Sequence, residues 1–165
     1  MRRVVVTGLG VVSSIGNNAD EVLASLKAGK SGITFNEDMA EHGFRSRIAG
    51  NVKLNVADHV DKRTLRFMGP GAAYAHIAMG QAIADAGLEP GDVINERTGL
   101  VAGSGGPSTS AMLAAHQAVL SSGATKRIGP FAVPKTMCST VSANLSTAYQ
   151  IKGINYSITS ACSTS

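Results

Sequence analysis

Tryptophan is absent from this 165-residue sequence, which has only two cysteines, 4% aromatic residues and 16% charged residues. Two cysteines cannot form a disulfide framework for a chain of this length. Few charges beside 44% hydrophobic residues exclude an intrinsically disordered chain. No apolar run approaches the roughly 18 residues that a membrane-spanning helix needs. The composition therefore predicts a folded cytoplasmic protein with reduced thiols and no membrane segment.

Positive charge is modest, with a formal net charge of +4. Nucleic-acid binding needs basic residues gathered on one surface, with aromatic side chains for stacking, so we expect no nucleic-acid partner. Two small basic groups are present, Lys62 with Arg63 and Arg66, and Lys126 with Arg127. An acidic protein is attracted to such groups as readily as a phosphate backbone is. They are candidate docking residues, and an ordinary solvated face is the alternative.

Strand-like and helix-like segments alternate along the chain, which predicts an α/β fold. The apolar, β-branched residues 3–12 predict a strand buried on both faces, and Asn17 or Asn18 would cap a helix over 19–28. Residues 30–60 are expected to form an irregular excursion over the surface. The later predicted elements are a helix over about 71–86 that is buried nearly all round, a strand over 98–102, helices over about 109–121 and 136–150, and a strand over 154–160.

The sequence ends at Ser165, five residues after the last predicted strand. A helix that began near Ala161 would be cut in its first turn, and a complete domain seldom ends so close to a core strand. We therefore expect residues 1–165 to be an N-terminal piece of a longer protein.

Glycine is abundant, with 19 residues, but its clusters do not form a nucleotide-binding motif. The dinucleotide fingerprint G-x-G-x-x-G would need glycine at positions 13 and 108, which are Ser13 and Ser108. The glycines around Gly8 and Gly105 instead predict close packing of backbone.

Cys162 is the main candidate for chemistry. It follows a predicted strand, lies among small residues and stands where a helix would begin. Unpaired N–H groups at such a position favour the thiolate and would stabilise an oxyanion formed when sulfur attacks a carbonyl. An inert buried cysteine is the alternative that spacing alone leaves open. Cys138 is expected to be a packing residue inside the helix over 136–150.

Histidine does not supply a metal site or an evident base. The four histidines have no pairwise metal-ligand spacing, and each is expected to be a surface or core residue. They are His42, His59, His76 and His116. We therefore predict no metal.

Several segments in one register resemble a known family. They are VVVTGLGVVSSIGNN at 4–18, SGITF at 31–35, NVKL at 51–54, RFM at 66–68, QAIADAGL at 81–88, AGSGG at 102–106 and NYSITSACSTS at 155–165. Together they resemble the N-terminal half of bacterial β-ketoacyl-acyl carrier protein synthases, most closely the type I enzymes, which are condensing enzymes of the thiolase superfamily. The resemblance implies a thiolase-like fold, with a mixed β-sheet between helices.

The resemblance also implies an activity in fatty acid biosynthesis. Cys162 matches the family's nucleophile and would hold the acyl chain as a thioester. Malonyl-acyl carrier protein would lose carbon dioxide, and the resulting carbanion would attack the acyl-cysteine and lengthen the chain by two carbons. No cofactor is implied. The family's catalytic histidines and lysine lie beyond Ser165, so the 165-residue chain alone is not expected to condense.

Partners follow from the same resemblance. Lys62, Arg63 and Arg66 match the basic patch that family members present to the acidic acyl carrier protein, and Lys126 and Arg127 fall near a second basic site. Family members are homodimers that pair through the strand corresponding to 154–160, and Met137 matches a residue near the partner's acyl pocket. The alternatives are a type II synthase, a polyketide ketosynthase, or an inactive piece that only binds the carrier protein or a partner subunit.

Overall fold

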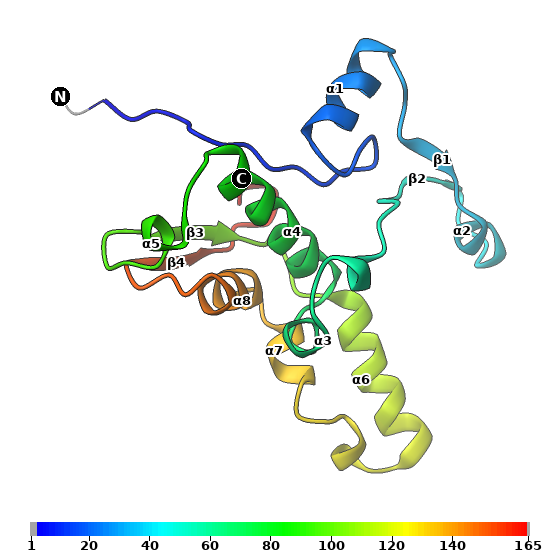
Figure 1. The fold of residues 1–165 in the computed structure, drawn as a ribbon. Coiled ribbons are helices and arrows are strands. Elements are labelled where there is room, and N and C mark those ends of the chain that lie inside the picture. The colour runs from blue at the N-terminus through cyan, green and yellow to red at the C-terminus, as the bar shows by residue number, and fades with distance from the viewer. Residues whose placement is uncertain (1–2, 165) are drawn as a thin grey trace.

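A computed structural model describes residues 3–164 as a mixed arrangement of helices and short strands (Figure 1). The helices are α1 (Ala19–Lys27), α2 (Glu37–Glu41), α3 (Lys62–Leu65), α4 (Pro70–Asp85), α5 (Pro90–Val93), α6 (Thr109–Ser122), α7 (Ala132–Thr136) and α8 (Thr140–Ala148). The strands are β1 (Ile33–Phe35), β2 (Ile48–Gly50), β3 (Leu100–Gly103) and β4 (Asn155–Ile158), and three 3-10 helices are η1 (Val56–Asp58), η2 (Thr125–Arg127) and η3 (Ala161–Ser163).

The pair of parallel strands β3 and β4 holds the C-terminal part of the chain together. Leu100 is paired with Asn155, and Gly103 with Ile158. Helix α8, which lies between them in sequence, packs against both strands, and α4 packs on α8. A parallel pair joined by a helical crossover is the unit from which α/β folds are built, so the predicted fold class is confirmed.

The N-terminal segment 3–12 is not a strand, and the prediction of a buried strand there is wrong. Val4 and Val6 are 94% and 90% exposed. No strand in the described part of the chain pairs with this segment. Instead, Asp85 and Gln81 on α4 accept hydrogen bonds from the N–H groups of Leu9 and Val11. Because strand formation needs a neighbour's backbone groups, apolar sequence alone leaves the segment extended.

Residues 30–60 are more regular than expected. β1 and β2 form an antiparallel pair in which Phe35 lies opposite Ile48. Between them, the side chain of Asn36 accepts a hydrogen bond from the Met39 N–H and caps α2. Figure 1 shows these elements together at one edge of the molecule. The strands have only three residues each, which is too short for a periodic pattern to predict.

Two longer helices begin and end where their sequence signals predict. Asn18 caps α1 by accepting from the Glu21 N–H, and Gly29 follows its end with a φ of +61°. Pro70 opens α4 and Gly87, with a φ of +65°, follows it. α4 is only half-buried along most of its length, contrary to the predicted burial all round, because neighbours cover it on part of its surface.

The helix predicted over 136–150 corresponds to α8 alone, which is shorter at both ends, and a separate short helix, α7, precedes it. α7 ends at Thr136, α8 begins at Thr140, and Met137 between them has an extended backbone with ψ of 142°. Cys138 therefore lies in the connection, half-buried, and not inside a helix.

The buried core is small. Val60, Met68, Ala72 and Ala73 form its main cluster, where α4 meets the segment before it. Many large apolar side chains stay exposed, including Val101 and Tyr156 on β3 and β4. Among the described residues, no helix has the length and apolar character to cross a bilayer.

Candidate functional site

Cys162 lies on an exposed turn directly after β4. It is the middle residue of η3, and its thiol is free. The sequence predicts the start of a helix here, and the described chain shows a three-residue 3-10 helix instead. Ala161, the residue before it, has a φ of +48°, which is unusual for a residue other than glycine. A positive φ turns the chain sharply and leaves the cysteine outside the strand pair.

Hydrogen bonds across the turn hold this geometry. The N–H of Ser163 donates to the C=O of Ser160 at 2.9 Å, and the N–H of Thr164 donates to the C=O of Ala161 at 3.2 Å. Within residues 3–164 the N–H of Cys162 has no acceptor. A free N–H next to the sulfur is available to an oxygen of a bound carbonyl.

The glycine-rich loop after β3 packs directly against the cysteine turn. A Cβ added to Gly105 would lie 2.8 Å from the carbonyl oxygen of Ala161, and one added to Gly103 would overlap the Thr164 methyl group. The prediction that this glycine cluster serves close backbone packing is confirmed. The loop therefore packs against one side of the turn that carries Cys162.

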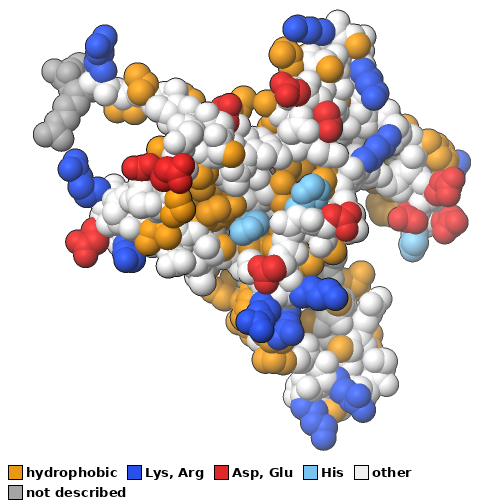
Figure 2. Space-filling view, viewed as in Figure 1, with side chains coloured by type: hydrophobic (Ala, Val, Ile, Leu, Met, Phe, Trp, Pro, Cys, Tyr) orange, Lys and Arg blue, Asp and Glu red, His pale blue; other side chains and the backbone are white. Residues whose placement is uncertain are grey.

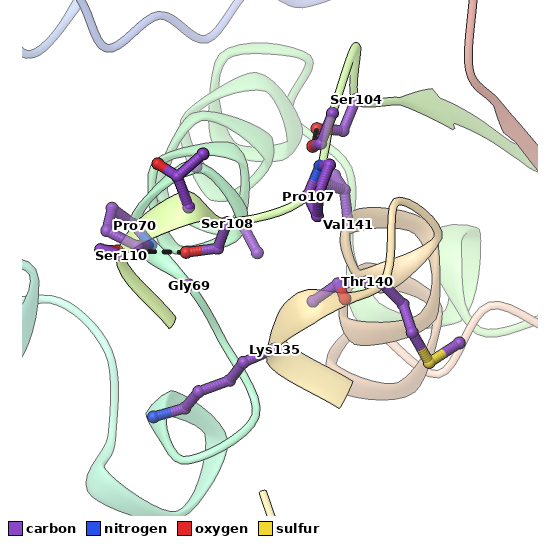
Figure 3. Close-up of a pocket in the computed structure, with 14 residues that line it drawn as sticks. Gly69, Pro70, Ser104, Pro107, Ser108, Ser110, Lys135, Thr140 and Val141 are labelled. Carbon is purple, nitrogen blue, oxygen red and sulfur yellow. Dashed lines mark hydrogen bonds between the residues drawn. The ribbon is translucent and has the colours of Figure 1, made fainter. Parts of the chain in front are cut away.

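A cavity of about 240 Å³ lies beside the same loop. Ser104 and Gly106 line it, together with Met137 from the α7–α8 connection. In Figure 3, Pro70 and Ser108 lie on one side of it and Thr140 and Val141 on the other. Cys162 is not among its lining residues, so Met137 and the cysteine do not share this cavity.

The five basic candidates form two separate groups. Lys62 and Arg63 lie in α3, and Arg66 ends it; all three are exposed. Lys126 and Arg127 lie in η2, beyond the end of α6. Figure 2 shows Lys and Arg side chains gathered in two places that correspond to these elements. The structure therefore does not bring the two groups together within one chain.

An apolar cavity of about 360 Å³ beside α3 was not expected from the sequence. Arg63 and Phe67 line it, together with Pro134 and Asn144. Phe67 also meets the Phe131 ring edge to face, with centroids 5.1 Å apart. The only sequence signal is an aromatic residue, Phe67, directly after the basic group, and the residues from α7 and α8 come together only on folding.

His76 lies half-buried on α4, outside the sites described above. Its Nδ1 is buried without a hydrogen-bond partner, and its ring lies 5.0 Å from that of Tyr149. Burial lowers the pKa of His76, while the negative charge of Asp61 acts in the opposite direction. His76 contacts α8 and is not part of the Cys162 turn.

Comparison with known proteins gives a consistent result. The family model described as the N-terminal domain of beta-ketoacyl synthase matches residues 1–165. The chain is 55% identical over its full length to the 3-oxoacyl-[acyl-carrier-protein] synthase 1 of Haemophilus influenzae, and 51% identical to that of Escherichia coli strain K12. In both cases the chain spans 41% of the relative's length.

Solved structures agree on the fold. A beta-ketoacyl synthase from Burkholderia phymatum superimposes with a TM-score of 0.81 at 29% identity, over 99% of this chain and 41% of that one. A type II polyketide ketosynthase, solved in complex with its acyl-carrier protein, superimposes with a TM-score of 0.68 at 17% identity, which supports the fold alone. By its sequence along the whole length and by its fold, the chain belongs to the beta-ketoacyl synthase family and contains that family's N-terminal domain.

Proposed function

We propose that this chain is the nucleophile-bearing half of a condensing enzyme of fatty acid synthesis. Cys162 takes an acyl chain from acyl carrier protein, and the complete enzyme extends that chain by two carbons from malonyl-acyl carrier protein. The observation that carries the proposal is the exposed Cys162 thiol on a sharp turn after β4, next to its own N–H, which has no acceptor within residues 3–164. Relatives that match the chain over its whole length are named 3-oxoacyl-[acyl-carrier-protein] synthase 1.

The first step is transfer of the acyl group. The Cys162 thiolate attacks the carbonyl carbon of the carrier-bound thioester, and a new carbon–sulfur bond forms. The carbonyl oxygen becomes negative in the tetrahedral intermediate, where the N–H of Cys162 donates a hydrogen bond to it. The bond to the carrier sulfur then breaks, and the carrier leaves as a thiol with the proton that Cys162 had lost.

The second step forms the carbon–carbon bond. The carrier-bound malonyl group loses carbon dioxide, and the electron pair left on its α-carbon attacks the carbonyl carbon of the acyl-Cys162 thioester. The Cys162 sulfur leaves, and the product remains on the carrier. Stabilising that carbanion needs further groups, which we place in the C-terminal half of the family. Residues 1–165 alone are therefore expected to accept an acyl group but not to condense it.

Carrier binding is assigned to the basic groups. Acyl carrier proteins are acidic, and Lys62, Arg63 and Arg66 present exposed positive charge on α3 beside an apolar cavity. A phosphopantetheine arm and acyl chain need apolar contacts as well as charge, which this arrangement offers. Lys126 and Arg127 lie elsewhere in one chain, so they would add to the same docking surface only from a second subunit.

A homodimer accounts for two further features. All four residues of β4 are exposed, and its free edge is open to a second copy of the chain. Met137 is 48% exposed and does not share a cavity with Cys162, as expected for a residue that completes the acyl pocket of the partner. We place the enzyme in the cytoplasm, in keeping with its two free thiols.

The test is acylation of Cys162 in the polypeptide as its gene encodes it. Incubation with a long-chain acyl-carrier thioester should add the mass of one acyl group, and peptide mapping should place it on Cys162. Cys162→Ser should abolish the gain, whereas Cys138→Ser, the matched cysteine control, should retain it. No gain in the parent protein, or a gain on Cys138, would contradict the proposal. Carrier binding without acylation would favour the alternative of a protein that only binds.

A further inference from the structure

The turn that presents Cys162 is closed by a side chain and not only by backbone. We propose that Thr164 is a positioning residue whose hydroxyl fixes the backbone on both sides of Cys162. The proposal rests on the proposed function, because a fixed turn matters only if the Cys162 sulfur reacts.

The hydroxyl of Thr164 makes two hydrogen bonds across the turn. Its Oγ1 accepts from the N–H of Ser160 at 2.9 Å and donates to the C=O of Ala161 at 2.7 Å. Ser160 and Ala161 are the two residues that directly precede Cys162. One oxygen atom therefore connects the chain before the cysteine to the chain after it.

The conformation of Ala161 explains why such a link is needed. Its φ of +48° is in the left-handed region, which residues with a Cβ rarely adopt unless their surroundings impose it. The Thr164 hydroxyl holds the Ala161 carbonyl, and the backbone N–H of Thr164 donates to the same oxygen at 3.2 Å. Without the hydroxyl the Ala161 carbonyl keeps only the longer bond from the Thr164 N–H, so the Ala161 peptide is less restrained against rotation toward negative φ, and the Cys162 sulfur moves with it.

The glycine-rich loop fixes the side chain of Thr164 in turn. The Thr164 methyl group lies where a Cβ on Gly103 would be, so that residue must lack one. A Cβ on Gly105 would press on the Ala161 carbonyl oxygen at 2.8 Å. Threonine has few χ1 rotamers, so packing that fixes the position of its methyl group also fixes its hydroxyl group, which here points toward the turn. Threonine thus combines a packed methyl with a bonded hydroxyl at one position.

Two substitutions separate these contributions. Thr164→Val keeps the branched shape but removes both hydrogen bonds, and Thr164→Ser keeps the hydroxyl but removes the methyl. Thr98→Val is the matched control, because the Thr98 hydroxyl also donates to a backbone carbonyl, that of Asp92, at an exposed site outside the Cys162 turn. All variants are to be made in the full polypeptide.

The first measurement is the rate of Cys162 alkylation by iodoacetamide as a function of pH, which needs neither carrier nor acyl group. The second is the rate of Cys162 acylation from an acyl-carrier thioester. Thr164→Val is expected to move the midpoint of the alkylation profile and to slow acylation by about tenfold or more, because small displacements of a reacting atom have large effects on rate. Thr164→Ser should have the alkylation profile and the acylation rate of the parent protein. Thr98→Val should leave both quantities unchanged.

Two results would overturn the proposal: parent-like rates for Thr164→Val at every pH, or rates for a folded Thr164→Ser as low as those for Thr164→Val. If Thr164→Val does not fold, Gly105→Ala tests the same point by displacing the Ala161 carbonyl, and parent-like rates there would also overturn it. If alkylation of Cys162 depends on Thr164 but the protein is never acylated, the positioning role stands and the proposed function is contradicted. If the protein is acylated at a rate that does not depend on Thr164, the proposed function stands and the positioning role is contradicted.

Discussion

At the scale of single residues, His76 is a titratable group whose ring is held in a partly buried site. Its Nδ1 is buried without a hydrogen-bond partner. Tyr149 packs its ring against the imidazole and donates its hydroxyl proton to the His76 carbonyl at 2.8 Å. The imidazole therefore sits between α4 and the end of α8, where a positive charge would be poorly solvated.

This environment predicts that stability falls in mild acid. Burial lowers the pKa of His76, and Asp61 offsets part of that effect. The unfolded chain, where the pKa is about 6.5, thus binds more protons than the folded chain once the pH falls below that value. The stabilisation is complete above about pH 6.5 and declines as the pH falls through the lowered pKa of the folded state. Thermal melting between pH 5 and 8 measures it.

His76→Phe keeps an aromatic ring against Tyr149 and removes the titration. The difference in melting temperature between parent and His76→Phe should therefore grow as the pH falls below 6.5. His116 is an exposed histidine on α6, so His116→Gln is the control. Its melting temperature should follow that of the parent at every pH. An equal acid dependence in parent and His76→Phe would show that His76 stays neutral or exposed throughout.

At the scale of elements, α3 is a four-residue helix that depends on its cap. The Asp61 carboxylate accepts from the N–H groups of Arg63 and Thr64 at 2.9 and 3.1 Å. A hydrogen bond from the Thr64 side chain, followed by those from the backbone N–H groups of Thr64 and Arg63, lowers the pKa of Asp61, so the carboxylate cap persists at neutral pH. The cap holds in place the helix that exposes Lys62 and Arg63.

Charge reversal on α3 tests its assignment to carrier docking. Glutamate in place of Lys62, Arg63 and Arg66 should weaken binding of acyl carrier protein by about tenfold or more, chiefly through slower association at low salt. Binding kinetics at two or more salt concentrations measure this. The same triple reversal at Lys27, Lys30 and Arg45 alters net charge equally and should have a much smaller effect. Unchanged affinity at moderate salt for the α3 variant would refute the assignment.

At the scale of the whole molecule, exposed apolar surface is unusually extensive. Val4, Val5 and Val6 are each at least 74% exposed, and the buried core is confined to a few residues around α4. The chain spans 41% of the length of the first relatives that it matches. In the synthase proposed above, further parts of the polypeptide or a second subunit would cover this surface.

Hydrogen exchange tests this picture on a polypeptide of residues 1–165. The N–H groups of Val4 to Val6 have no acceptor within the described residues and should exchange within the dead time of the experiment, whereas those of β3 and β4 should be protected. Leu9 and Val11, which donate to α4 side chains, should fall between. If the N–H groups of Val4 to Val6 are protected and stay protected on dilution, the claim that this segment has no backbone partner is contradicted. If their protection is lost on dilution, the segment pairs between copies of the chain.

The sequence by itself determined the features that depend on near neighbours. Asn18 and Gly29 bound α1, and Pro70 and Gly87 bound α4, because caps and positive φ act over a few residues. Cys162 was identified as the candidate nucleophile through its local context and family resemblance.

Only the tertiary structure decided the features that join distant segments. Whether residues 3–12 form a strand depends on a partner strand, which no local pattern encodes. The contact of Gly103 with Thr164 spans about sixty residues of sequence, and the cavity beside α3 combines Arg63 with residues of α8. Such contacts follow from how helices and strands pack on one another. The sequence therefore predicts which side chain reacts, and only the fold decides which distant residues pack around it.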